Sequence, residues 1–327
     1  MSINIPRSVC ITGGTGSLGT KLSEILANEI RWNRIVIYSR DWHKQETLRK
    51  LVGNSPKFRW FLGDVSDRER LTTALQEVDC VIHAAALKSV PDGEYNPSEL
   101  SKINISGTEK VIQASIEAGV SKVMVVSSDK CCHAVNSYGK SKAMAESLAV
   151  GYNSYTSGGK TKIAVSRYGN VINSSGSVIP IFTELAKANI PIGITGYQMT
   201  RFWITLEDAA KFVLRRLDDM QAGEIYIPKI KAASVYDVVQ VIREYYSSTS
   251  DTYEMGIRPG EKLHEILFSV EEARHTYEID DYYCIFPEIH LWDRNKIPRG
   301  KLYSGGIEYS SYNAMTSRGE LRKLIYG

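Results

Sequence analysis

The sequence lacks long apolar runs and any strong charge of one sign. No stretch approaches the roughly 18 consecutive apolar residues of a bilayer-spanning helix, so we expect no membrane insertion. The formal net charge is only +3 and no dense Lys/Arg block occurs, which argues against nucleic acid as a partner. The segment Met1–Pro6 has no basic start followed by a long apolar stretch, so we expect no secretory signal.

Cysteine is scarce, with five in 327 residues. The five show no metal-ligand spacing, so we expect no metal site. Cys10 and Cys80 lie in apolar, strand-like runs, where a cysteine is usually a small buried hydrophobe. Together with the missing signal, this pattern favours a reducing, cytoplasmic setting.

Short apolar runs alternate with amphipathic stretches in the first half of the chain. The expected strands are Ser8–Thr12, Arg34–Tyr38, Phe58–Leu62, Cys80–Ala84, Lys122–Ser127 and Ile163–Arg167. The expected helices are Ser17–Ile30, Lys44–Val52, Glu69–Leu75, Pro97–Ala118 and Tyr138–Tyr152. This alternation predicts an α/β fold with a Rossmann-type, doubly wound parallel sheet.

The alternation loosens in the second half, which predicts three parts. We expect residues 1–170 to form the Rossmann domain and residues 171–281 to form a smaller C-terminal substrate-binding lobe, some segments of which return to the first domain. Residues 282–327 are expected to be an irregular tail packed on the body. Within the lobe we expect strands near Ile192–Thr195 and Glu224–Ile227, and helices at Leu206–Asp218 and Ser234–Tyr245.

The first strand leads into a glycine turn. Gly13, Gly16 and Gly19 are spaced G-x-x-G-x-x-G between an apolar strand and an amphipathic helix. Without Cβ atoms, the backbone N–H groups of such a turn can approach a pyrophosphate at the helix N-terminus. The turn therefore predicts dinucleotide binding, and a merely structural turn is the alternative. The other turn residues that we assign to the cofactor are Thr15, Ser17 and Leu18.

The second strand ends in Ser39 and Arg40, with Lys44 close behind. A site that prefers NAD usually has an acidic side chain here, which binds the ribose 2′-hydroxyl. A guanidinium instead matches a 2′-phosphate bidentately, so the pattern favours NADP. The alternative is that Arg40 is a solvated charge and that Asp41 takes the ribose.

An acidic side chain also follows the third strand, at Asp64, with Val65 next to it. Asp64 could accept a hydrogen bond from the adenine amino group, and it could equally cap the next helix. The two roles are compatible.

Tyr138 and Lys142 stand four residues apart at the start of a predicted helix, behind the capping candidates Asn136 and Ser137. Residues at that spacing share a helix face. A neighbouring ammonium lowers the pKa of a phenol, so Tyr138 can exchange a proton with a substrate hydroxyl during hydride transfer. Lys142 can also hold the nicotinamide ribose. The alternative is an ordinary pair on a helix surface.

Ser128, Asp129 and Lys130 lie between the fifth strand and this helix. In open α/β sheets, ligands gather outside the carboxyl ends of the strands, which places these residues at the same site. A plain dehydrogenase needs only Ser, Tyr and Lys, so the additional acid and amine indicate proton chemistry beyond hydride transfer. The alternative is a capped turn with solvated charges.

A series of motifs now resembles a known family. The motifs are Thr12-Gly-Gly-Thr-Gly-Ser, Ser39-Arg40-Asp41, Gly63-Asp64-Val65, Ala84-Ala-Ala-Leu-Lys-Ser-Val-Pro91, Ser128-Asp129-Lys130, Tyr138-Gly-Lys-Ser-Lys142, Arg167-Tyr-Gly-Asn-Val171, Gly176-Ser-Val-Ile-Pro180, Met199-Thr-Arg-Phe-Trp203 and Arg258-Pro-Gly-Glu-Lys-Leu-His264. In this order they resemble the inverting UDP-N-acetylglucosamine 4,6-dehydratases. These are extended short-chain dehydrogenases/reductases of surface-polysaccharide and flagellin-sugar pathways.

The resemblance implies a hydro-lyase with a tightly bound NADP that is recycled within each catalytic cycle. Hydride would leave C4 of the sugar while Tyr138 takes the hydroxyl proton. Lys130 would then act as the base at C5 and Asp129 as the acid toward the C6 hydroxyl, before hydride returns to C6. Retaining relatives typically carry Asp-Glu at these two positions, which favours inversion at C5 here. We also expect a UDP-sugar as partner and a homo-oligomer.

The resemblance assigns further ligand contacts by position. Those to the cofactor are Ala84, Ala86, Lys88 and Val171. Those to the UDP-sugar are Lys88, Asn170, Val178, Thr195, Arg201, Arg258 and Glu261. The two arginines suit a diphosphate, and the alternative is that they are surface charges.

The chain departs from the family pattern at a few positions. Ser128 replaces the usual Thr and keeps the hydroxyl group. Cys131-Cys132 replaces small residues, and we interpret the pair as packing residues rather than a redox switch. Ser174-Ser175 stands where an arginine is usual, and Asp92-Gly93 alters a loop, so a different acyl group or hexose is compatible with the sequence.

Two other classes of function compete with dehydration. A nucleotide-sugar 4-epimerase or a reductase of the same fold would share the glycine turn, Tyr138 and Lys142, but neither needs Asp129 and Lys130. A non-catalytic NADP-binding protein would need none of these four side chains.

Overall fold

A computed structural model describes residues 7–156, 160–288 and 299–327 of the chain. The expectation about Met1–Pro6 therefore lies outside the described residues, as does part of the predicted tail, residues 289–298. Within the described ranges, every helix is too short or too polar to cross a bilayer.

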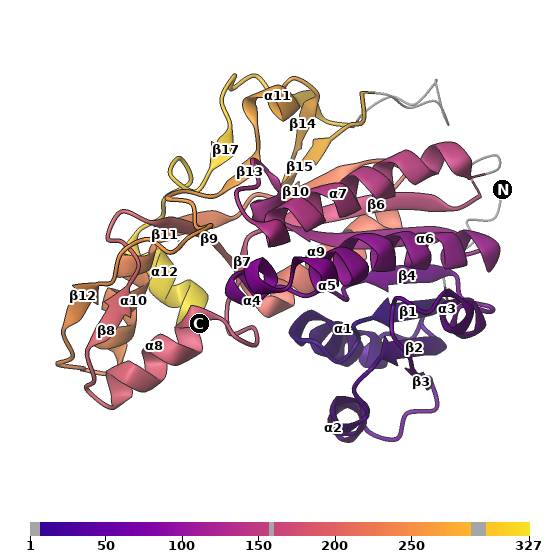
Figure 1. Ribbon diagram of the computed structural model, residues 1–327, viewed down its shortest axis with the longest axis horizontal. Helices are drawn as coiled ribbons and strands as arrows, with labels where there is room; N and C mark the ends of the chain where they lie inside the picture. Colours follow the sequence, from indigo (N-terminus) through magenta and orange to yellow (C-terminus); the bar gives the residue numbers. More distant parts are fainter. Residues whose placement is uncertain (1–6, 157–159, 289–298) are drawn as a thin grey trace.

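A ten-stranded sheet forms the centre of the fold, in the order β16-β14-β15-β10-β6-β5-β4-β1-β2-β3 (Figure 1). Its parallel part comprises β1 (Ser8–Thr12), β2 (Arg34–Ser39), β3 (Phe58–Leu62), β4 (Cys80–His83), β5 (Lys122–Ser128), β6 (Lys162–Tyr168) and β10 (Ile225–Pro228). The winding reverses between β1 and β4, which is where such sheets bind ligands. The predicted doubly wound Rossmann-type sheet is thus confirmed.

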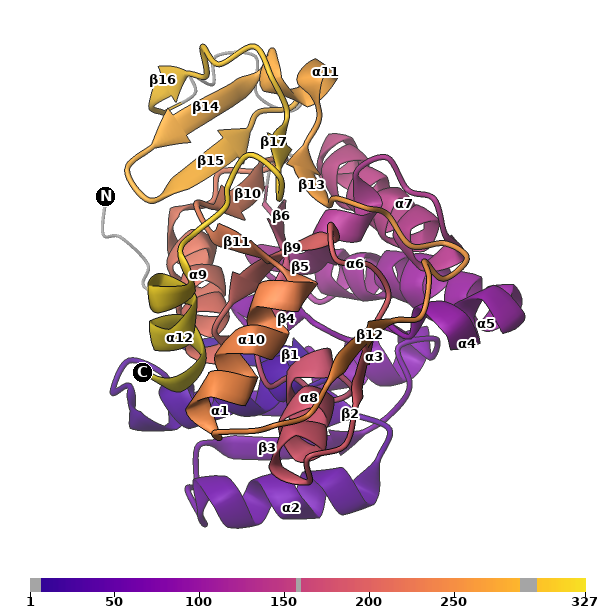
Figure 2. The same cartoon turned by 90° about the vertical axis from the view of Figure 1, so that its left-hand side faces the viewer.

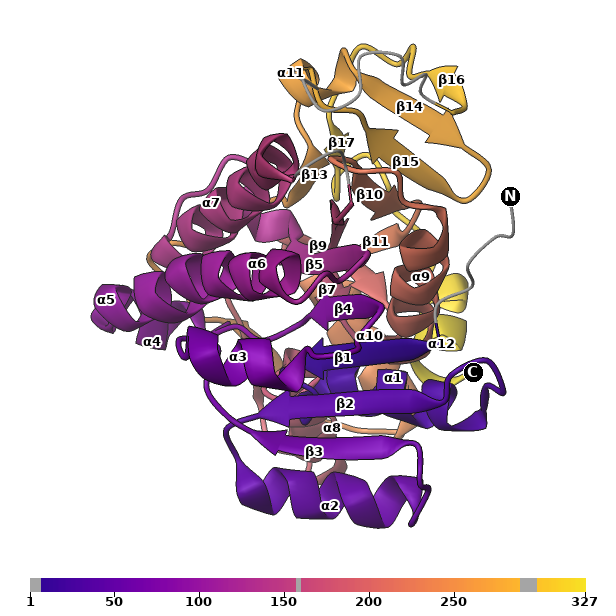
Figure 3. The ribbon, with the colours of Figure 1, turned by 90° about the vertical axis from the view of Figure 1, so that its right-hand side faces the viewer.

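Helices cover both faces of this sheet (Figure 3). One face carries α1 (Ser17–Asn28), α2 (Trp42–Val52) and α9 (Leu206–Asp219), and the other carries α3 (Arg68–Ala74), α6 (Gly107–Glu117) and α7 (Ser137–Gly151). Successive side chains of a strand point to opposite faces. Ile11 therefore packs in the core with Leu22 of α1, whereas Cys10 packs with Val111 of α6. Because helices cover these central strands on both sides, both faces of each strand carry apolar residues.

The helix expected at Pro97–Ala118 is present from Pro97 to Glu117, but it contains a π-helical turn, and a short helix precedes it. The structure has α4 (Val90–Tyr95), α5 (Pro97–Leu100) and a π-helical turn, η1 (Ser101–Ser106), before α6 begins. Such turns are frequent at functional sites. The turn holds Asn104, which is buried and whose amide bonds both the N–H and the carbonyl of Leu87 and the hydroxyl of Ser141. Asn104 thereby ties the loop after β4 to α7.

The smaller lobe stands against the carboxyl ends of the parallel strands (Figure 2). Its helices α8 (Val178–Lys187), α10 (Val235–Tyr245) and α12 (Arg318–Tyr326) share one apolar core. β7 (Asn170–Val171), β9 (Thr200–Ile204) and β11 (Lys231–Ser234) form a small sheet, and β8 (Ile192–Ile194) pairs with β12 (Thr252–Glu254). β10 returns to the large sheet. The boundaries at residues 170 and 281 remain a proposal.

The irregular tail expected from Tyr282 onward is wrong for much of its described part. β15 (Tyr282–Ile285) joins the large sheet antiparallel to β10, and β14 (Thr276–Ile279) and β16 (Lys301–Leu302) extend it. β13 (Ile266–Phe268) pairs with β17 (Tyr309–Ser310). Two short helices lie outside this tail, α11 (Val270–Ala273) and η3 (Tyr152–Tyr155). Tyrosines favour strands, but β10, one of the two strands that pair with β15, lies far back in the sequence, where periodicity does not reveal the pairing.

Candidate active site

The glycine turn between β1 and α1 leaves room for a phosphate group. Gly13 has φ of +69°, and a Cβ there would lie 2.7 Å from the backbone of Ala85. A Cβ on Gly19 would lie 2.5 Å from Gly14, so this position needs glycine for helix–strand packing. Gly16, in contrast, would meet only the Gly13 carbonyl, at 3.2 Å. No side chain caps α1 at Gly16, so its first N–H groups are available to an anion.

The two charged residues that follow β2, Arg40 and Asp41, make different contacts. The Asp41 side chain accepts from Lys44 N at 2.9 Å and so caps α2. Arg40 is exposed and its Nη1 lies 3.2 Å from Asp64 Oδ2, across the end of β3. The acid that could have taken the ribose is thus engaged in a cap, while the guanidinium stands at the edge of the site. Ser39 is buried beneath it.

Asp64 does not cap the next helix. Asp67 is the N-cap of α3, and Asp64 instead accepts from Ser66 N at 2.8 Å. Partial burial would raise the pKa of Asp64, but hydrogen bonds from Ser66 and the charge of Arg40 together lower it. Val65 is buried against Gly107 of α6.

The remaining cofactor candidates surround this turn. The loop after β4 carries Ala84, Ala86 and Lys88, and the close approach of Gly13 to Ala85 brings it against the glycine turn. From the lobe, Ser175 N donates to Ser17 Oγ at 2.9 Å. The open turn and the uncapped helix together fit the pyrophosphate of a dinucleotide, and Arg40 lies at the end of β2 beside them.

Ser128, Asp129 and Lys130 lie where β5 ends and the 3₁₀ turn η2 (Asp129–Cys131) begins. Lys130 Nζ lies 3.0 Å from Asp129 Oδ1 and 3.0 Å from Asn170 Oδ1 on β7. Ser128 Oγ donates to the same Asp129 oxygen at 2.9 Å. Asp129 is fully buried, so the alternative of a turn with solvated charges is wrong.

The protonation of this pair is set by its surroundings. Burial raises the pKa of Asp129, and Glu265 adds to the rise against the opposing effect of Lys130. Burial alone would lower the pKa of Lys130, but Asp129 and Glu265 outweigh it, so the pKa lies above its ordinary value. Asp129 Oδ2 is buried without a hydrogen-bond partner among the described residues. The acid is therefore easier to protonate than usual and lies beside an amine that carries a proton.

The catalytic helix α7 begins behind Asn136, whose Oδ1 accepts from Gly139 N at 2.7 Å. Ser137, the second capping candidate, is the first helical residue. Tyr138 and Lys142 both lie on the buried face of α7, so the alternative of a surface pair is wrong.

Lys142 is not the cation that chiefly opposes the burial of Tyr138. Burial raises the pKa of Tyr138 to about 12, and the cation that acts against this rise is Lys130. Lys142 Nζ instead donates to the carbonyl of Val126, and burial lowers its pKa to about 8. In this structure the Lys142 ammonium is directed at a backbone carbonyl, so the predicted effect of Lys142 on the phenol stays a prediction.

Glu265 joins this cluster although the sequence analysis missed it. It is buried, and its Oε1 lies 3.7 Å from Lys130 Nζ and 3.9 Å from Arg201 Nε. Its Oε2 lies 3.2 Å from Lys262 Nζ. The only sequence signal was its place directly after the motif that ends at His264. Arg201 is buried here, so the alternative of a surface charge is wrong for it.

The other predicted substrate residues are not joined to Lys130 by direct contacts. Arg258 is exposed, and its N–H donates to Glu261 Oε2 at 3.4 Å. Asn136 Nδ2 donates to the carbonyl of Gly260 at 2.7 Å, which holds this loop at the start of α7. Thr195 Oγ1 bonds Met199 Sδ in the lobe. Val171 and Val178 lie at β7 and at the start of α8.

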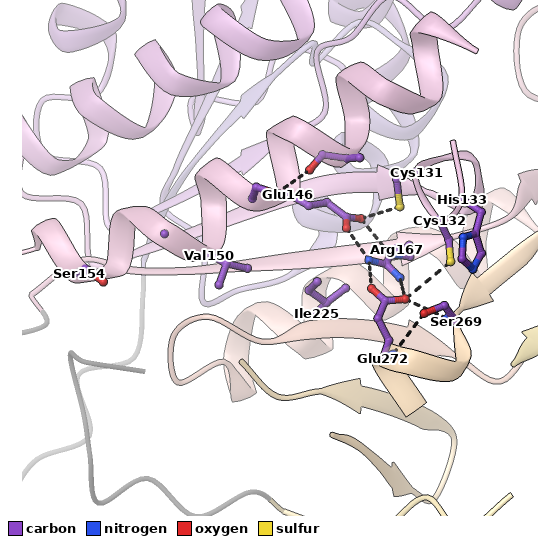
Figure 4. A pocket seen from close by; sticks show the side chains of 13 residues that line it. Cys131, Cys132, His133, Glu146, Val150, Ser154, Arg167, Ile225, Ser269 and Glu272 are labelled. Atoms are coloured by element: carbon purple, nitrogen blue, oxygen red, sulfur yellow. Dashed lines mark hydrogen bonds and ion pairs between the residues drawn. The ribbon is translucent and has the colours of Figure 1, made fainter. Parts of the chain in front are cut away.

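A second buried charge network lies behind the catalytic turn (Figure 4). Arg167 on β6 bonds Glu146 on α7 at 2.5 Å and Glu272 on α11 at 2.8 Å. Cys131 donates to Glu146 at 3.1 Å and Cys132 to Glu272 at 3.7 Å. These residues line a cavity of about 670 Å³.

The two adjacent cysteines are therefore hydrogen-bond donors as well as packing residues. Both are buried, and burial raises the pKa of each thiol. Since the thiolate is the reactive form, both groups are poor nucleophiles. They anchor the far end of the turn that carries Asp129 and Lys130.

Comparison with known proteins places the chain among nucleotide-sugar enzymes. Residues 9–287 match the model of the family described as polysaccharide biosynthesis protein. A Campylobacter jejuni protein named UDP-N-acetylglucosamine 4,6-dehydratase (inverting) is 42% identical over 98% of this chain and 97% of its own. A Rickettsia rickettsii protein named UDP-glucose 4-epimerase is 38% identical over 86% of this chain and 83% of its own.

Solved structures show the same fold. The X-ray structure of Pen from Bacillus thuringiensis superposes with a TM-score of 0.89 at 32% identity and covers 99% of this chain and 98% of that one. DesIV from Streptomyces venezuelae, a dTDP-glucose 4,6-dehydratase solved with NAD and TYD bound, reaches a TM-score of 0.71 at 20% identity, with coverage of 78% and 86%. The second likeness concerns the fold alone.

Removal of Arg167 should destabilise the protein strongly. In Arg167→Met, buried Glu146 and partly buried Glu272 would be left without their cation, which costs about 3–5 kcal/mol of the free energy of unfolding. The matched control is Arg215→Met, which breaks the exposed pair with Asp281 and should cost less than about 1 kcal/mol. Urea unfolding measures both, and equal losses would contradict the prediction.

Lys142 should make stability rise with pH. Its pKa is about 8 in the folded protein and about 10.4 in an unfolded chain, so the unfolded state binds more protons between these values. From about pH 7.5 to 9.5, wild type should gain on the order of 2 kcal/mol relative to Lys142→Met. Urea unfolding at both pH values measures the difference, with the exposed Lys140→Met as control. Equal pH slopes in wild type and Lys142→Met would refute it.

Proposed function

The chain belongs to the polysaccharide biosynthesis protein family, and we propose that it is an inverting UDP-N-acetylglucosamine 4,6-dehydratase. The product is a UDP-2-acetamido-2,6-dideoxy-hexos-4-ulose. One observation supports this most directly, namely the contact of Lys130 with buried Asp129 and with Asn170 at the carboxyl end of β5. Hydride transfer alone has no use for this amine and acid, whereas elimination of water needs both a base and an acid.

NADP is the proposed cofactor, tightly bound and recycled. When bound, it would accept a hydride from C4 of the sugar and later return it to C6, while a proton from solvent adds to the opposite face of C5 and inverts its configuration. Residues of the glycine turn would hold its pyrophosphate, and Arg40 would bind the 2′-phosphate. Lys142 would hold the nicotinamide ribose. Asp41 is less suited to a ribose because it caps α2.

Tyr138 takes the proton of the C4 hydroxyl. Its pKa of about 12 keeps the phenol protonated in the free protein, so Tyr138 must release its own proton to solvent before it can take that of the C4 hydroxyl. A positive charge near the phenol of Tyr138 favours its deprotonated form, and the ammonium of Lys130 lowers its pKa in this way. Ser128, which also hydrogen-bonds the phenol, further lowers its pKa.

Asp129 and Lys130 eliminate water from the 4-keto sugar. The proton of Lys130 passes to Asp129 across their 3.0 Å contact, which yields a neutral amine and a carboxylic acid. The amine takes the C5 proton, the C5–C6 double bond forms, and the departing C6 hydroxyl takes the proton of Asp129 and leaves as water. The 4-keto group must form first because it makes the C5 hydrogen acidic.

The substrate contacts and the biological setting are part of the proposal. Arg201 and Arg258 suit the diphosphate, with Lys88, Asn170, Val178, Thr195 and Glu261 as further contacts to the UDP-sugar. We propose a homo-oligomer that works in the cytoplasm.

A 4-epimerase is the second candidate, since curated relatives of both kinds resemble this chain. Epimerisation uses Tyr138 and Lys142 but leaves the C6 hydroxyl in place. It therefore gives no role to an acid and an amine beside each other.

Proton NMR of the reaction in D₂O distinguishes these activities. With UDP-N-acetylglucosamine, a dehydratase should give a 6-deoxy-4-keto sugar with a C6 methyl signal and one deuterium at C5, of inverted configuration, and no net change in NADPH. An epimerase would give the C4 epimer with its C6 hydroxymethyl group intact.

Variants test the assigned residues in the same assay. Lys130→Met and Tyr138→Phe should each lower turnover by at least about a hundredfold, the typical contribution of a general acid or base, and should still bind NADP. The control Lys229→Met, at an exposed pair with Glu278, should keep wild-type turnover. Undiminished turnover in Lys130→Met would exclude the proposed elimination.

Arg40→Ala tests the choice of cofactor. Loss of a charge-assisted contact to the 2′-phosphate should weaken NADP binding by about tenfold to a hundredfold and leave NAD binding nearly unchanged. Calorimetric titration with each cofactor measures this, with Arg59→Ala on β3 as control. Equal weakening for both cofactors would show that Arg40 does not bind the phosphate.

A further inference from the structure

Glu265 brings a second carboxylate to the catalytic amine, and the reaction as proposed has no step for it. Glu265 lies just before β13, in the segment that follows the Arg258–His264 motif. Its N–H donates to Ser311 Oγ at 2.9 Å, and its carbonyl accepts from Ser311 N at 2.8 Å. The backbone is therefore fixed on both sides, and the buried side chain points toward Lys130.

The two carboxylates near Lys130 differ in their other neighbours. Glu265 also faces Arg201 at 3.9 Å and Lys262 at 3.2 Å, and these cations with Lys130 hold its pKa below the ordinary value despite burial. Asp129 has Lys130 as its only close cation among the described residues, and burial together with Glu265 raises its pKa. One carboxyl group therefore stays charged, while the other is prepared to take a proton.

Lys262 links this arrangement to the catalytic turn. Its Nζ donates to the carbonyl of Cys132 at 2.6 Å while it pairs with Glu265. The segment that contains Lys262 and Glu265 thus contacts the turn twice. Lys262 bonds the backbone carbonyl of Cys132 at the end of the turn, and Glu265 pairs with the Lys130 ammonium. The remaining ionisable group that faces Lys130 and Asp129 is Tyr138 of α7.

We infer that Glu265 is a positioning residue, a permanently charged carboxylate that holds Lys130 in place and makes Asp129 the carboxyl group that receives its proton. The inference rests on the proposed dehydration. If Glu265 accepted the proton instead, the acid would form on the wrong side of Lys130, and Asp129 could not deliver it to the departing hydroxyl. With Glu265 compensated by Arg201 and Lys262, the proton moves along the contact between Lys130 and Asp129.

Opposite changes of charge near the pair provide the test. In the active form, Asp129 and Lys130 share one transferable proton. The dehydration rate is therefore highest at the pH where Asp129 has lost its proton and Lys130 has kept its own. Glu265→Gln removes a negative charge, which lowers the pKa of both Asp129 and Lys130, so both limbs of the pH–kcat profile should move to lower pH by about one unit. Lys262→Met removes a positive charge and should move both limbs to higher pH.

Further variants separate charge from structure. Glu265→Asp keeps the charge and should restore the wild-type pH profile, with a lower kcat because the carboxylate is withdrawn. Glu265→Gln should lower kcat by at least about tenfold and leave KM within about threefold, since Glu265 acts through Lys130. Glu278→Gln, at an exposed pair on β14, is the matched control and should match wild type.

The outcomes are distinct. If wild type forms no 6-deoxy-4-keto sugar, the proposed function fails, and this inference with it. If wild type dehydrates its substrate but kcat falls in Glu265→Gln without a shift of the profile, or both variants shift it in the same direction, the inference alone fails. Should Glu265→Gln not fold, as judged by circular dichroism and NADP binding, the direction of the Lys262→Met shift decides.

Discussion

The ion pair between fully buried Asp129 and partly buried Lys130 is the constraint on which the site depends. Removing two charges from water costs several kcal/mol for each ion, and their attraction compensates only where other polar groups complete the environment. Here the completion comes from separate parts of the chain. Ser128 lies next to the pair, Asn170 follows β6, and Glu265 arrives from the segment before β13. The pair is therefore stable only in the fully folded protein.

The turn that carries the pair is held at both of its ends. On the site side, Lys130 bonds Asn170 of the small sheet. On the opposite side, Arg167 joins carboxylates of α7 and α11, and these accept from the thiols of Cys131 and Cys132. A short 3₁₀ turn has little rigidity of its own. The two polar networks supply the fixed geometry that proton transfer over about 3 Å demands.

The C-terminal third of the chain contributes more than a cover for the substrate. It extends the large sheet through β15 and β14, and it delivers Lys262 and Glu265 to the catalytic turn. The site is thus assembled where the Rossmann sheet, the small sheet of β7, β9 and β11, and this segment meet. This explains how the fold can place the proposed proton-transfer pair beside a dinucleotide site.

What the sequence determined by itself was local. The alternation of strands and helices, the glycine turn, the i, i+4 spacing of Tyr138 and Lys142 and the succession of Ser128, Asp129 and Lys130 all lie within short windows, where periodicity and capping rules apply. Tertiary structure decided the approach of Glu265 to Lys130, the direction of Lys142 toward Val126 and the pairing of β15 with β10. These depend on how distant segments close on one another, and burial in that closed fold sets the charges of the site, which no local pattern encodes.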